Sequence, residues 1–514
     1  MLTQKDKDDS YYEHYTIIPL HENKENQTAC TLYQVVKIED VPLDNREKNL
    51  DVMCFPHLFV LGCNGQCDES RPVKLQDHEF IKCLLTSMDP RFRVDPQYLF
   101  FELNRGNIRQ LRRGIYHKLN ITNPRICYKA AECLDAISKE ILESDLNTIF
   151  SSLRNTEQYW RRPRSDLSCM TQHYGPATWF LTLSPSEWLW DDLDEYIHEV
   201  NGWQNSSLST SVLVAKDPVS TSRFLDNKFR AMLDFICSKD CPIGEVKHYF
   251  WRREYQGRGI QHFHLLIWIK DAPIFGESSI QEVSKFISQY ISCKMPDKNI
   301  SPLLYRRVDT HQRHKHNDYC LRSKKVGRKV IRRCRFGFPR PVTETLNIRD
   351  VPTAIAGRKQ LKHKSRLYDL PRTNNEVDIN DYNPAILTAW EGNMDIQFIG
   401  EKSTLLTWYV TKYLNKAAKS ELSDFDLANC KNDKNKSLAS VLWNFGLRSI
   451  SSRECGALEA ADTLLGIPLY GTDRNTTIKW LDVNSIRQRK LKNHKEIEAL
   501  DSESTDIFLS IFNR

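Results

Sequence analysis

The chain has 514 residues, of which 40% are hydrophobic and 27% are charged, and its formal net charge is +7. This length is more than one typical domain needs, and the composition is that of a soluble globular protein. No apolar run approaches the roughly 18 residues that span a bilayer, so we expect no membrane anchor. The first thirty residues lack the apolar centre of a secretory signal, which predicts an intracellular address.

The chain also contains fifteen cysteines, an odd number in a sequence without an export signal. A reducing compartment keeps thiols free, and clustered thiols can then bind metal ions. We therefore expect free thiols or a metal site rather than a framework of disulfides.

The first part of the chain divides into two segments. Residues 1–45 are polar and have no sustained periodicity, so we expect a disordered or ragged N-terminus. Residues 46–165 carry apolar clusters separated by Gly, Pro and Asp, and we expect a mostly helical domain there. Within it, residues 129–153 keep Ala, Leu and Ile at three-four spacing, which predicts a helix.

Residues 170–300 form the predicted central domain. Its expected elements are a strand at 175–184, a hairpin of 247–256 and 260–270, and a helix that Ser279 and Glu282 open with a capping box. The strands are rich in aromatic and β-branched residues, and the helix has one apolar face. A strand, a hairpin and a covering helix predict the α+β class.

The rest of the chain alternates polar and structured segments. We expect a basic insertion at 301–345, a polar connector at 346–385, a strand and a helix within 386–420, and a helical region at 421–514. The strand, at 394–401, is expected to return to the sheet. The helix covers 403–420, and a further helix is expected at 453–466. No phosphate-binding loop of the form G-x-x-x-x-G-K-[ST] occurs in the sequence.

The basic insertion concentrates the charge of the chain. Residues 306–340 contain thirteen Lys and Arg against two Asp, a local excess of +11. Such a basic stretch attracts polyanions, of which nucleic acid is the commonest, and Arg332, Arg333 and Arg335 are the candidate phosphate contacts. A solvated charged loop is the alternative.

Two histidines stand one residue apart in the second strand of the hairpin. His262 and His264 point to one face of a strand, while Phe263 points to the other. With a three-residue loop, Glu254 lies directly across from His262. Two imidazoles and a carboxylate suit a divalent ion that also holds a phosphate oxygen, although two structural histidines are the alternative.

A pair of tyrosines lies on the helix at 403–420. Tyr409 and Tyr413 are four residues apart and therefore share a face, and Lys412 and Lys416 lie on the same flank. A phenol can attack phosphorus and form a phosphotyrosine, and the lysines would favour the phenolate, with Lys416 the better candidate for the catalytic role. Two aromatic residues at the margin of a core are the alternative.

The two motifs, in this order, resemble the HUH endonuclease family, whose name describes His-hydrophobic-His followed by a tyrosine helix. More narrowly, the chain resembles the Rep nuclease portion of Helitron-type rolling-circle transposases, the Helitron helicase-like N-terminal domain family. The matching stretches are "FPHLFVLG" (55–62), "RPVKLQDHEFIK" (71–82), "WFLTLSPSEW" (179–188), "EYQGRGIQHFHLLIW" (254–268), "CRFGFPRP" (334–341), "YVTKYLNK" (409–416) and "RECGALEAADTLLG" (453–466). The resemblance extends over about residues 50–470.

The resemblance implies an antiparallel HUH nuclease palm flanked by helices, with a helical N-terminal domain and a helical C-terminal extension. It implies Mg²⁺ or Mn²⁺ on His262 and His264 with a polar third ligand, either Glu254 or its rival Gln256. By position, Tyr409 and Tyr413 are the paired nucleophiles. Complete elements of this type continue into a helicase, so a helicase on a missing C-terminal segment is a candidate partner.

A second cluster of metal-binding residue types lies in the basic insertion. His314, His316, Cys320 and Cys334 have the identities for a closed tetrahedral zinc site. Their spacing is not that of a common zinc finger. A basic DNA-contacting loop in which the four residues only pack is the alternative.

The sequence therefore predicts a metal-dependent single-stranded DNA endonuclease and strand transferase of a Helitron-like element. Its expected partners are the transposon ends and the target as single-stranded DNA, and its expected location is the nucleus. One alternative is a catalytically inactive or domesticated DNA-binding protein that derives from such an element. Another is a structural zinc and RNA-binding protein.

Overall fold

The computed structural model describes residues 14–19, 33–38, 47–122, 150–203, 208–255, 257, 259–326, 329–348, 367–404, 438–451 and 453–473. The chain divides into two compact units, Met1–Gly471 and Thr472–Arg514. Every element below belongs to the first unit, apart from the last residue of the final strand. None of the described helices is long and apolar enough to cross a membrane.

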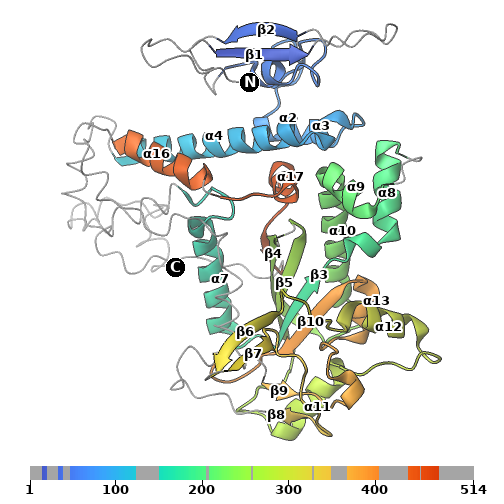
Figure 1. Ribbon diagram of the computed structural model, residues 1–514. Helices are drawn as coiled ribbons and strands as arrows, with labels where there is room; N and C mark the ends of the chain where they lie inside the picture. Colours follow the sequence, from blue (N-terminus) through green and yellow to red (C-terminus); the bar gives the residue numbers. More distant parts are fainter. Residues whose placement is uncertain are drawn as a thin grey trace, which may run out of the picture. The chain divides into compact units, whose positions relative to one another are not determined.

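A five-stranded antiparallel sheet forms the centre of the fold (Figure 1). Its strands are β3 (Trp179–Ser184), β4 (Val246–Tyr255), β5 (Gln261–Ile269), β10 (Asn393–Phe398) and β11 (Tyr470–Thr472), in the order β10-β3-β5-β4-β11. The predicted α+β class is confirmed. The expected return of a strand near 394–401 is also confirmed, because β10 pairs with β3 at the edge of the sheet.

The hairpin of β4 and β5 has the predicted position. Its turn contains Gly257 and Gly259, and Gly259 has a φ of 84°, a conformation that a side chain would disfavour. The pairing continues from Tyr255 opposite Gln261 to Val246 opposite Ile269. The long ladder fixes the register, and a slip of one residue would turn the apolar side chains of β5 away from the core.

One face of the sheet is covered by α10 (Pro218–Ile236). Asp217 caps this helix by accepting a hydrogen bond from the Ser220 N–H, and Pro218 occupies its first turn. The ring of Phe229 stacks on Phe263 of β5 with a centroid distance of 3.9 Å. Trp390 of α13 (Pro384–Trp390) packs edge-on against the same Phe263 ring. This face is the main apolar core behind β5.

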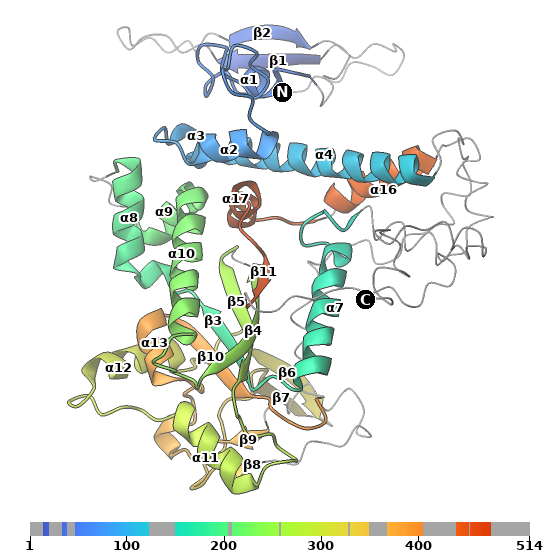
Figure 2. The same ribbon diagram turned by 180° about the vertical axis from the view of Figure 1, so that it is seen from behind.

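The other face of the sheet meets α7 (Glu157–Tyr174), which lies on the opposite side from α10 in both views (Figures 1 and 2). Residues alternate between faces along a strand, so Arg252 points away from the α10 side that Arg253 faces. The Arg252 guanidinium lies over the Trp160 ring of α7, 4.2 Å from its centroid. The helix α7 thus covers the end of the face on which His262 and His264 lie.

The helices of the N-terminal region share a core with a helix from the end of the chain. They are α1 (Leu50–Cys54), α2 (Asp77–Leu85), α3 (Arg91–Val94) and α4 (Pro96–Thr122), together with α16 (Leu438–Ser451) and α17 (Ala457–Leu465). Ala461 and Leu465 of α17 are buried among the aromatic side chains of this region. The predicted helix at 453–466 is confirmed, and it packs with the N-terminal helices.

The remaining elements lie around the sheet. They are α8 (Asp191–Asn201), α9 (Thr210–Lys216), α11 (Ile280–Tyr290), α12 (Pro302–Arg307), a π-helical turn η2 (Val308–Gln312), the strand pairs β6 (Leu321–Val326) with β7 (Lys329–Cys334) and β8 (Asn347–Ile348) with β9 (Tyr368–Asp369), and short turns at Glu187–Leu189 and Asn374–Glu376. The capping box of Ser279 and Glu282 is formed as predicted. The basic insertion contains the β6–β7 hairpin, which the sequence did not indicate.

The N-terminus differs from the prediction of a ragged segment. Strands β1 (His14–Pro19) and β2 (Tyr33–Ile38) pair antiparallel. Both carry a short β-branched run, Ile17 with Ile18 and Val35 with Val36, and such runs favour strands even between polar neighbours. The predicted helices at 129–153 and 403–420 fall mostly outside the described residues.

Candidate metal centre and nucleic-acid interface

The two histidines of β5 lie side by side on one face of the sheet. The rings of His262 and His264 have a centroid distance of 4.5 Å and are nearly perpendicular, at 86°. Phe263, between them, points to the opposite face and packs against α10. The prediction that the two imidazoles share one face is therefore confirmed.

Hydroxyl groups from the neighbouring strand hold both rings. Ser184 Oγ lies 2.9 Å from His262 Nδ1, and Thr182 Oγ1 lies 3.2 Å from His264 Nδ1. The ring of Phe180 stacks on His264 at 5.6 Å between centroids. A partner at Nδ1 fixes the orientation of an imidazole and makes Nε2 the nitrogen through which the ring would bind an ion.

Glu254 completes a cluster with the two rings. It lies directly across from His262 in the β4–β5 ladder, as predicted, and its Oε2 reaches His264 Nε2 at 3.1 Å. Burial acts to raise the pKa of Glu254, but the hydrogen bond to His264 and the nearby Arg252 charge bring it down to about 2. The side chain is 41% exposed, so an ionised carboxylate stands at the open side of the cluster.

Arg252 adds a buried positive charge to the same face. It pairs with His264 in the ladder and is 2% exposed. Burial lowers its pKa to about 10, while the Glu254 carboxylate acts in the opposite direction, so the guanidinium remains charged at neutral pH. The donor set of two imidazoles and one carboxylate, next to a fixed cation, fits a divalent ion that binds a phosphate oxygen.

Several predicted residues lie outside the part of the chain that the structure describes. They are Gln256, Tyr409, Lys412, Tyr413 and Lys416. Their predicted roles, third ligand for the first and nucleophiles or charge-stabilising groups for the others, stay predictions. The structure describes Glu254, His262 and His264, and it brings all three together.

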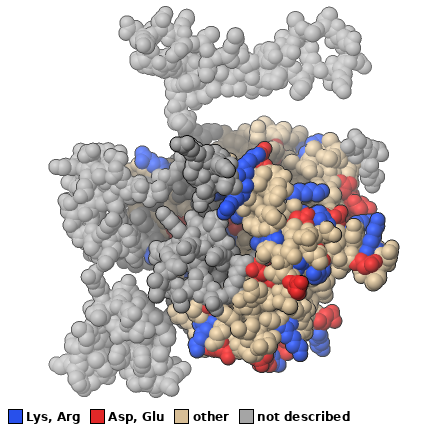
Figure 3. Space-filling view, turned by 60° about the horizontal axis from the view of Figure 1, so that its bottom comes forward, with Lys and Arg blue, Asp and Glu red and all other residues tan. Residues whose placement is uncertain are grey.

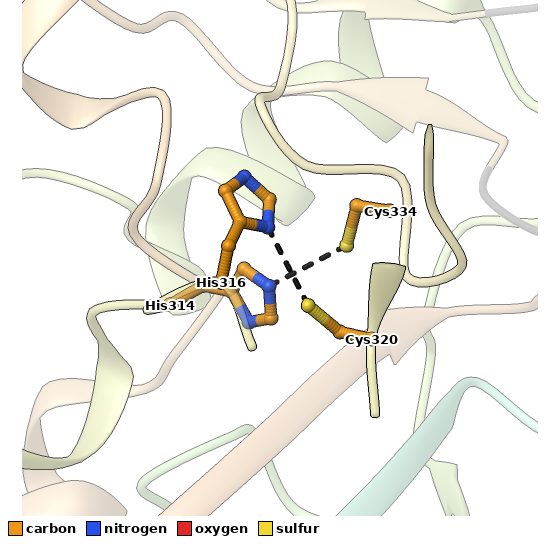
Figure 4. Close-up of side chains that lie close together, drawn as sticks. All are labelled: His314, His316, Cys320 and Cys334. Carbon is orange, nitrogen blue, oxygen red and sulfur yellow. Dashed lines mark hydrogen bonds between the residues drawn. The ribbon is translucent and has the colours of Figure 1, made fainter. Parts of the chain in front are cut away.

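A second cluster joins the four residues that the sequence singled out in the basic insertion. Potential ligand atoms of His314, His316, Cys320 and Cys334 all lie within 4.8 Å of one another (Figure 4). Cys320 directly precedes β6, Cys334 ends β7, and the two histidines follow η2. The sequence spacing of these residues gave no recognised motif, yet the fold brings them to one point.

A comparison with family models gives a match for residues 82–267, described as the Helitron helicase-like domain at N-terminus. This segment belongs to that family. The Helitron-like segment starts within α2 and ends within β5, so it includes Glu254, His262 and His264. It stops before the cluster of two histidines and two cysteines. No curated protein matches the chain.

The arginines predicted to contact DNA follow the Helitron-like segment in sequence and belong to the β6–β7 region. Arg332 and Arg333 are exposed, and Arg332 forms an ion pair of 2.8 Å with Asp318. The Arg335 guanidinium lies 3.8 Å from the centroid of the Tyr319 ring and 4.6 Å from that of Phe336. Tyr319 is 71% exposed and Phe336 45%, so this stack of three side chains faces solvent.

Figure 3 shows basic and acidic side chains interspersed over the described residues of the face that it presents. The excess of positive charge is therefore a property of the basic insertion rather than of the chain as a whole. A local excess of this kind concentrates the attraction for polyanions in one part of the chain.

Three residues of the site escaped the sequence reasoning. Thr182, Ser184 and Arg252 contact or flank the ligands, but no role was predicted for them, although Thr182 and Ser184 lie within the matching stretch 179–188. A signal was present in β3, because Thr182 and Ser184 are polar residues two apart in an otherwise apolar strand. That spacing places both on one face and marks it as the polar face.

Proposed function

We propose that the protein is a metal-dependent single-stranded DNA endonuclease and strand transferase of a Helitron-like rolling-circle element. The observation that carries this proposal is the cluster of His262, His264 and Glu254 on one face of the hairpin, with a hydroxyl at Nδ1 of each ring. The cluster lies inside the Helitron-like segment, whose family supports an interaction with DNA. Mg²⁺ or Mn²⁺ would be held by these three side chains.

A bound divalent ion would polarise the scissile phosphate and stabilise the charge that develops on it. The residues of the chain have separate tasks. Ser184 and Thr182 orient the two imidazoles, and Glu254 supplies the anionic ligand. Arg252 holds a fixed positive charge beside the ligands, which favours the approach of a phosphate.

The nucleophile in this proposal is the phenol of Tyr409 or Tyr413, both outside the described residues. The phenolate oxygen attacks the phosphorus of a DNA phosphodiester, and the bond from phosphorus to the 3′ oxygen breaks. The 3′ oxygen leaves and takes up a proton, so the products are a 5′-phosphotyrosine and a free 3′-hydroxyl. Lys412 and Lys416 would stabilise the phenolate. Two tyrosines allow one chain to hold two 5′ ends in succession, which suits strand transfer.

Single-stranded DNA is the substrate that the exposed stack of Arg335 with Tyr319 and Phe336 supports. Unpaired bases stack on aromatic rings and guanidinium planes, whereas paired bases keep their faces inside the duplex. The adjacent Arg332 and Arg333 would contact phosphates.

The deciding experiment is a search for a covalent adduct. The full chain is incubated with a 3′-labelled single-stranded oligonucleotide library and Mn²⁺ and then denatured, because the strand on the 3′ side of the cut is the one that stays on the tyrosine. We expect a labelled adduct that survives denaturant, needs the ion, and disappears in the double variant Tyr409→Phe with Tyr413→Phe. The double variant His262→Ala with His264→Ala should also abolish it.

Matched controls separate catalysis from folding. Tyr116→Phe and His78→Ala change exposed residues of the same types far from β5 in sequence, and they should leave the adduct unchanged. Binding of single-stranded DNA with no adduct under any condition would instead support the inactive, domesticated DNA-binding protein. An adduct that persists without both tyrosines would overturn the proposed nucleophile.

A further inference from the structure

The base of the β6–β7 hairpin holds four side chains that the proposed nuclease chemistry does not use. Cys320 is 1% exposed and lies one residue before β6, and Cys334 is the last residue of β7. His314 and His316 come from the loop that follows η2. All four point toward a common centre in Figure 4.

Two of the distances among these atoms match the edges of a tetrahedral site, and all of them are within 4.8 Å. Cys334 Sγ lies 3.4 Å from His314 Nε2, and Cys320 Sγ lies 3.5 Å from His316 Nδ1. With Zn–S bonds of about 2.3 Å and Zn–N bonds of about 2.0–2.1 Å, adjacent sulfur and nitrogen ligands of a tetrahedral zinc ion lie about 3.5–3.6 Å apart. These two distances therefore agree with zinc geometry to within about 0.2 Å.

The surroundings hold these ligands in place. The Asn317 backbone N–H donates to Cys320 Sγ at 3.2 Å, a contact that stabilises a thiolate. The His314 ring stacks on Phe338 at 4.4 Å between centroids, and its backbone N–H donates to Asp378 O at 2.7 Å. The first pair of the hairpin ladder, Leu321 with Cys334, sets the distance between the two cysteines.

We propose that His314, His316, Cys320 and Cys334 bind one zinc ion as a closed structural site. Four protein ligands of this kind fill a tetrahedral coordination sphere and leave no open position, so the ion would have no catalytic task. It would fasten the base of the basic hairpin to the loop after η2. The preceding turn η2 is itself joined to the central sheet, because the Asn393 side chain of β10 donates to His311 O at 2.6 Å.

This inference stands apart from the proposed nuclease. The four residues lie outside the Helitron-like segment, and they belong to different elements from Glu254 and the histidines of β5. A disulfide between Cys320 and Cys334 is the competing chemistry for the same thiols. It would leave the convergence of the two imidazoles without a reason, and Cys320 and Cys334 are both free thiols in the structure.

The test is the zinc content of the purified full chain. After dialysis against a weak chelator, elemental analysis should find about one zinc ion per chain, and the variant Cys320→Ser with Cys334→Ser should retain less than about a tenth of that. Cys83→Ser changes an exposed cysteine and is the matched control that keeps the ion. The variant His262→Ala with His264→Ala should also keep it, which separates this site from the ion on β5.

A second measurement needs no variant. Cobalt titrated into the chelator-stripped protein should give the visible absorption bands of a tetrahedral ion and the near-ultraviolet bands of thiolate ligation, and zinc should bleach both. Absence of zinc together with absence of these bands would overturn the proposal. Zinc that remains bound after loss of both cysteines, or an intact-mass shift that shows a Cys320–Cys334 disulfide, would do the same.

Discussion

Ser184 on β3 holds His262 on β5 through a contact of 2.9 Å between Oγ and Nδ1. Thr182 makes the corresponding contact with His264 at 3.2 Å. The strand beside β5 is thus an outer layer of the proposed metal centre. The two hydroxyls contact the imidazole rings and would orient them. Ser184 and Thr182 are therefore positioning residues and do not act on a substrate themselves.

Loss of these hydroxyls should weaken the binding of the ion without loss of the fold. We expect Ser184→Ala and Thr182→Val each to raise the Mn²⁺ concentration needed for half-maximal adduct formation about 10- to 100-fold, with a nearly unchanged rate at saturating Mn²⁺. The measurement is adduct yield against Mn²⁺ concentration. Thr182→Ser restores a hydroxyl and should restore the affinity, whereas Thr388→Ala, at a partly exposed position of α13, should have no effect. A fall in the saturated rate alone would show that the hydroxyls have another role.

Glu254 and Gln256 are rivals for the third ligand, and the proposed site uses Glu254, the one that the structure describes. Its Oε2 already lies 3.1 Å from His264 Nε2, and its low pKa keeps it anionic. We therefore expect Glu254→Ala to weaken Mn²⁺ binding about 100-fold or more and Gln256→Ala by less than about tenfold. Isothermal titration of Mn²⁺ into each variant would measure the difference. The reverse order of effects would make Gln256 the ligand.

The opposite face of the hairpin contains a buried charge network that ties α17 to the sheet. Arg253 and Asp462 have fully buried side chains and pair at 2.9 Å, while Arg253 also pairs with Asp226. The Tyr255 hydroxyl donates to Asp462 at 2.6 Å, and burial together with the Asp462 charge raises the pKa of Tyr255, so the hydroxyl keeps its proton. Removal of Asp462 would leave part of the Arg253 charge unpaired in the core.

We therefore expect Asp462→Ala to lower the free energy of unfolding by about 3 kcal/mol, the lower end of the range for breaking a buried ion pair, since Asp226 remains. Chemical denaturation followed by fluorescence would measure the change. Asp240→Ala alters an exposed carboxylate and should stay within about 0.5 kcal/mol of the parent. Equal stabilities of the two variants would mean that α17 is held to the sheet by its apolar contacts alone.

The sequence was most informative where one local rule determined the structure. The β4–β5 register, and with it the position of Glu254 opposite His262, followed from the length of the turn and the alternation of strand residues. The capping box of Ser279 followed from short-range chemistry in the same way. Such features depend on residues close together in the chain, and nothing distant overrides them.

Features that depend on distant residues were not predictable. The β6–β7 hairpin is rich in Lys and Arg, so it has no apolar alternation to indicate strands. The contact of Ser184 with His262 joins residues 78 positions apart, and the pairing of β3 with β5 that creates it cannot be read from either strand alone. The convergence of His314 and Cys334 across 20 positions depends likewise on the fold of the insertion.

Arg332 and Arg333 should contribute to the affinity for DNA through charge alone. Each phosphate contact that is lost reduces the slope of log affinity against log salt concentration by about 0.7 for a single strand. We expect Arg333→Gln to show this reduction, and Arg332→Gln to show a smaller one because Asp318 already neutralises part of its charge. Binding measured by fluorescence anisotropy at several salt concentrations gives the slopes. Lys74→Gln, at an exposed position of the N-terminal helical region, is the control and should leave the slope unchanged.

The exposed rings beside Arg335 should contribute through stacking, which salt does not screen. Tyr319 and Phe336 have centroids 6.4 Å apart, with the guanidinium close to both. Stacking of one base on an aromatic side chain contributes about 1–3 kcal/mol. We therefore expect Tyr319→Ala to weaken binding of single-stranded DNA about 5- to 150-fold with an unchanged salt slope, and to affect duplex DNA little, because its bases are already stacked. Tyr319→Phe keeps the ring and should bind like the parent. If Tyr319→Phe is as weak as Tyr319→Ala, the hydroxyl rather than the ring contacts the DNA, and if both variants bind normally, the strand follows another path over the basic insertion.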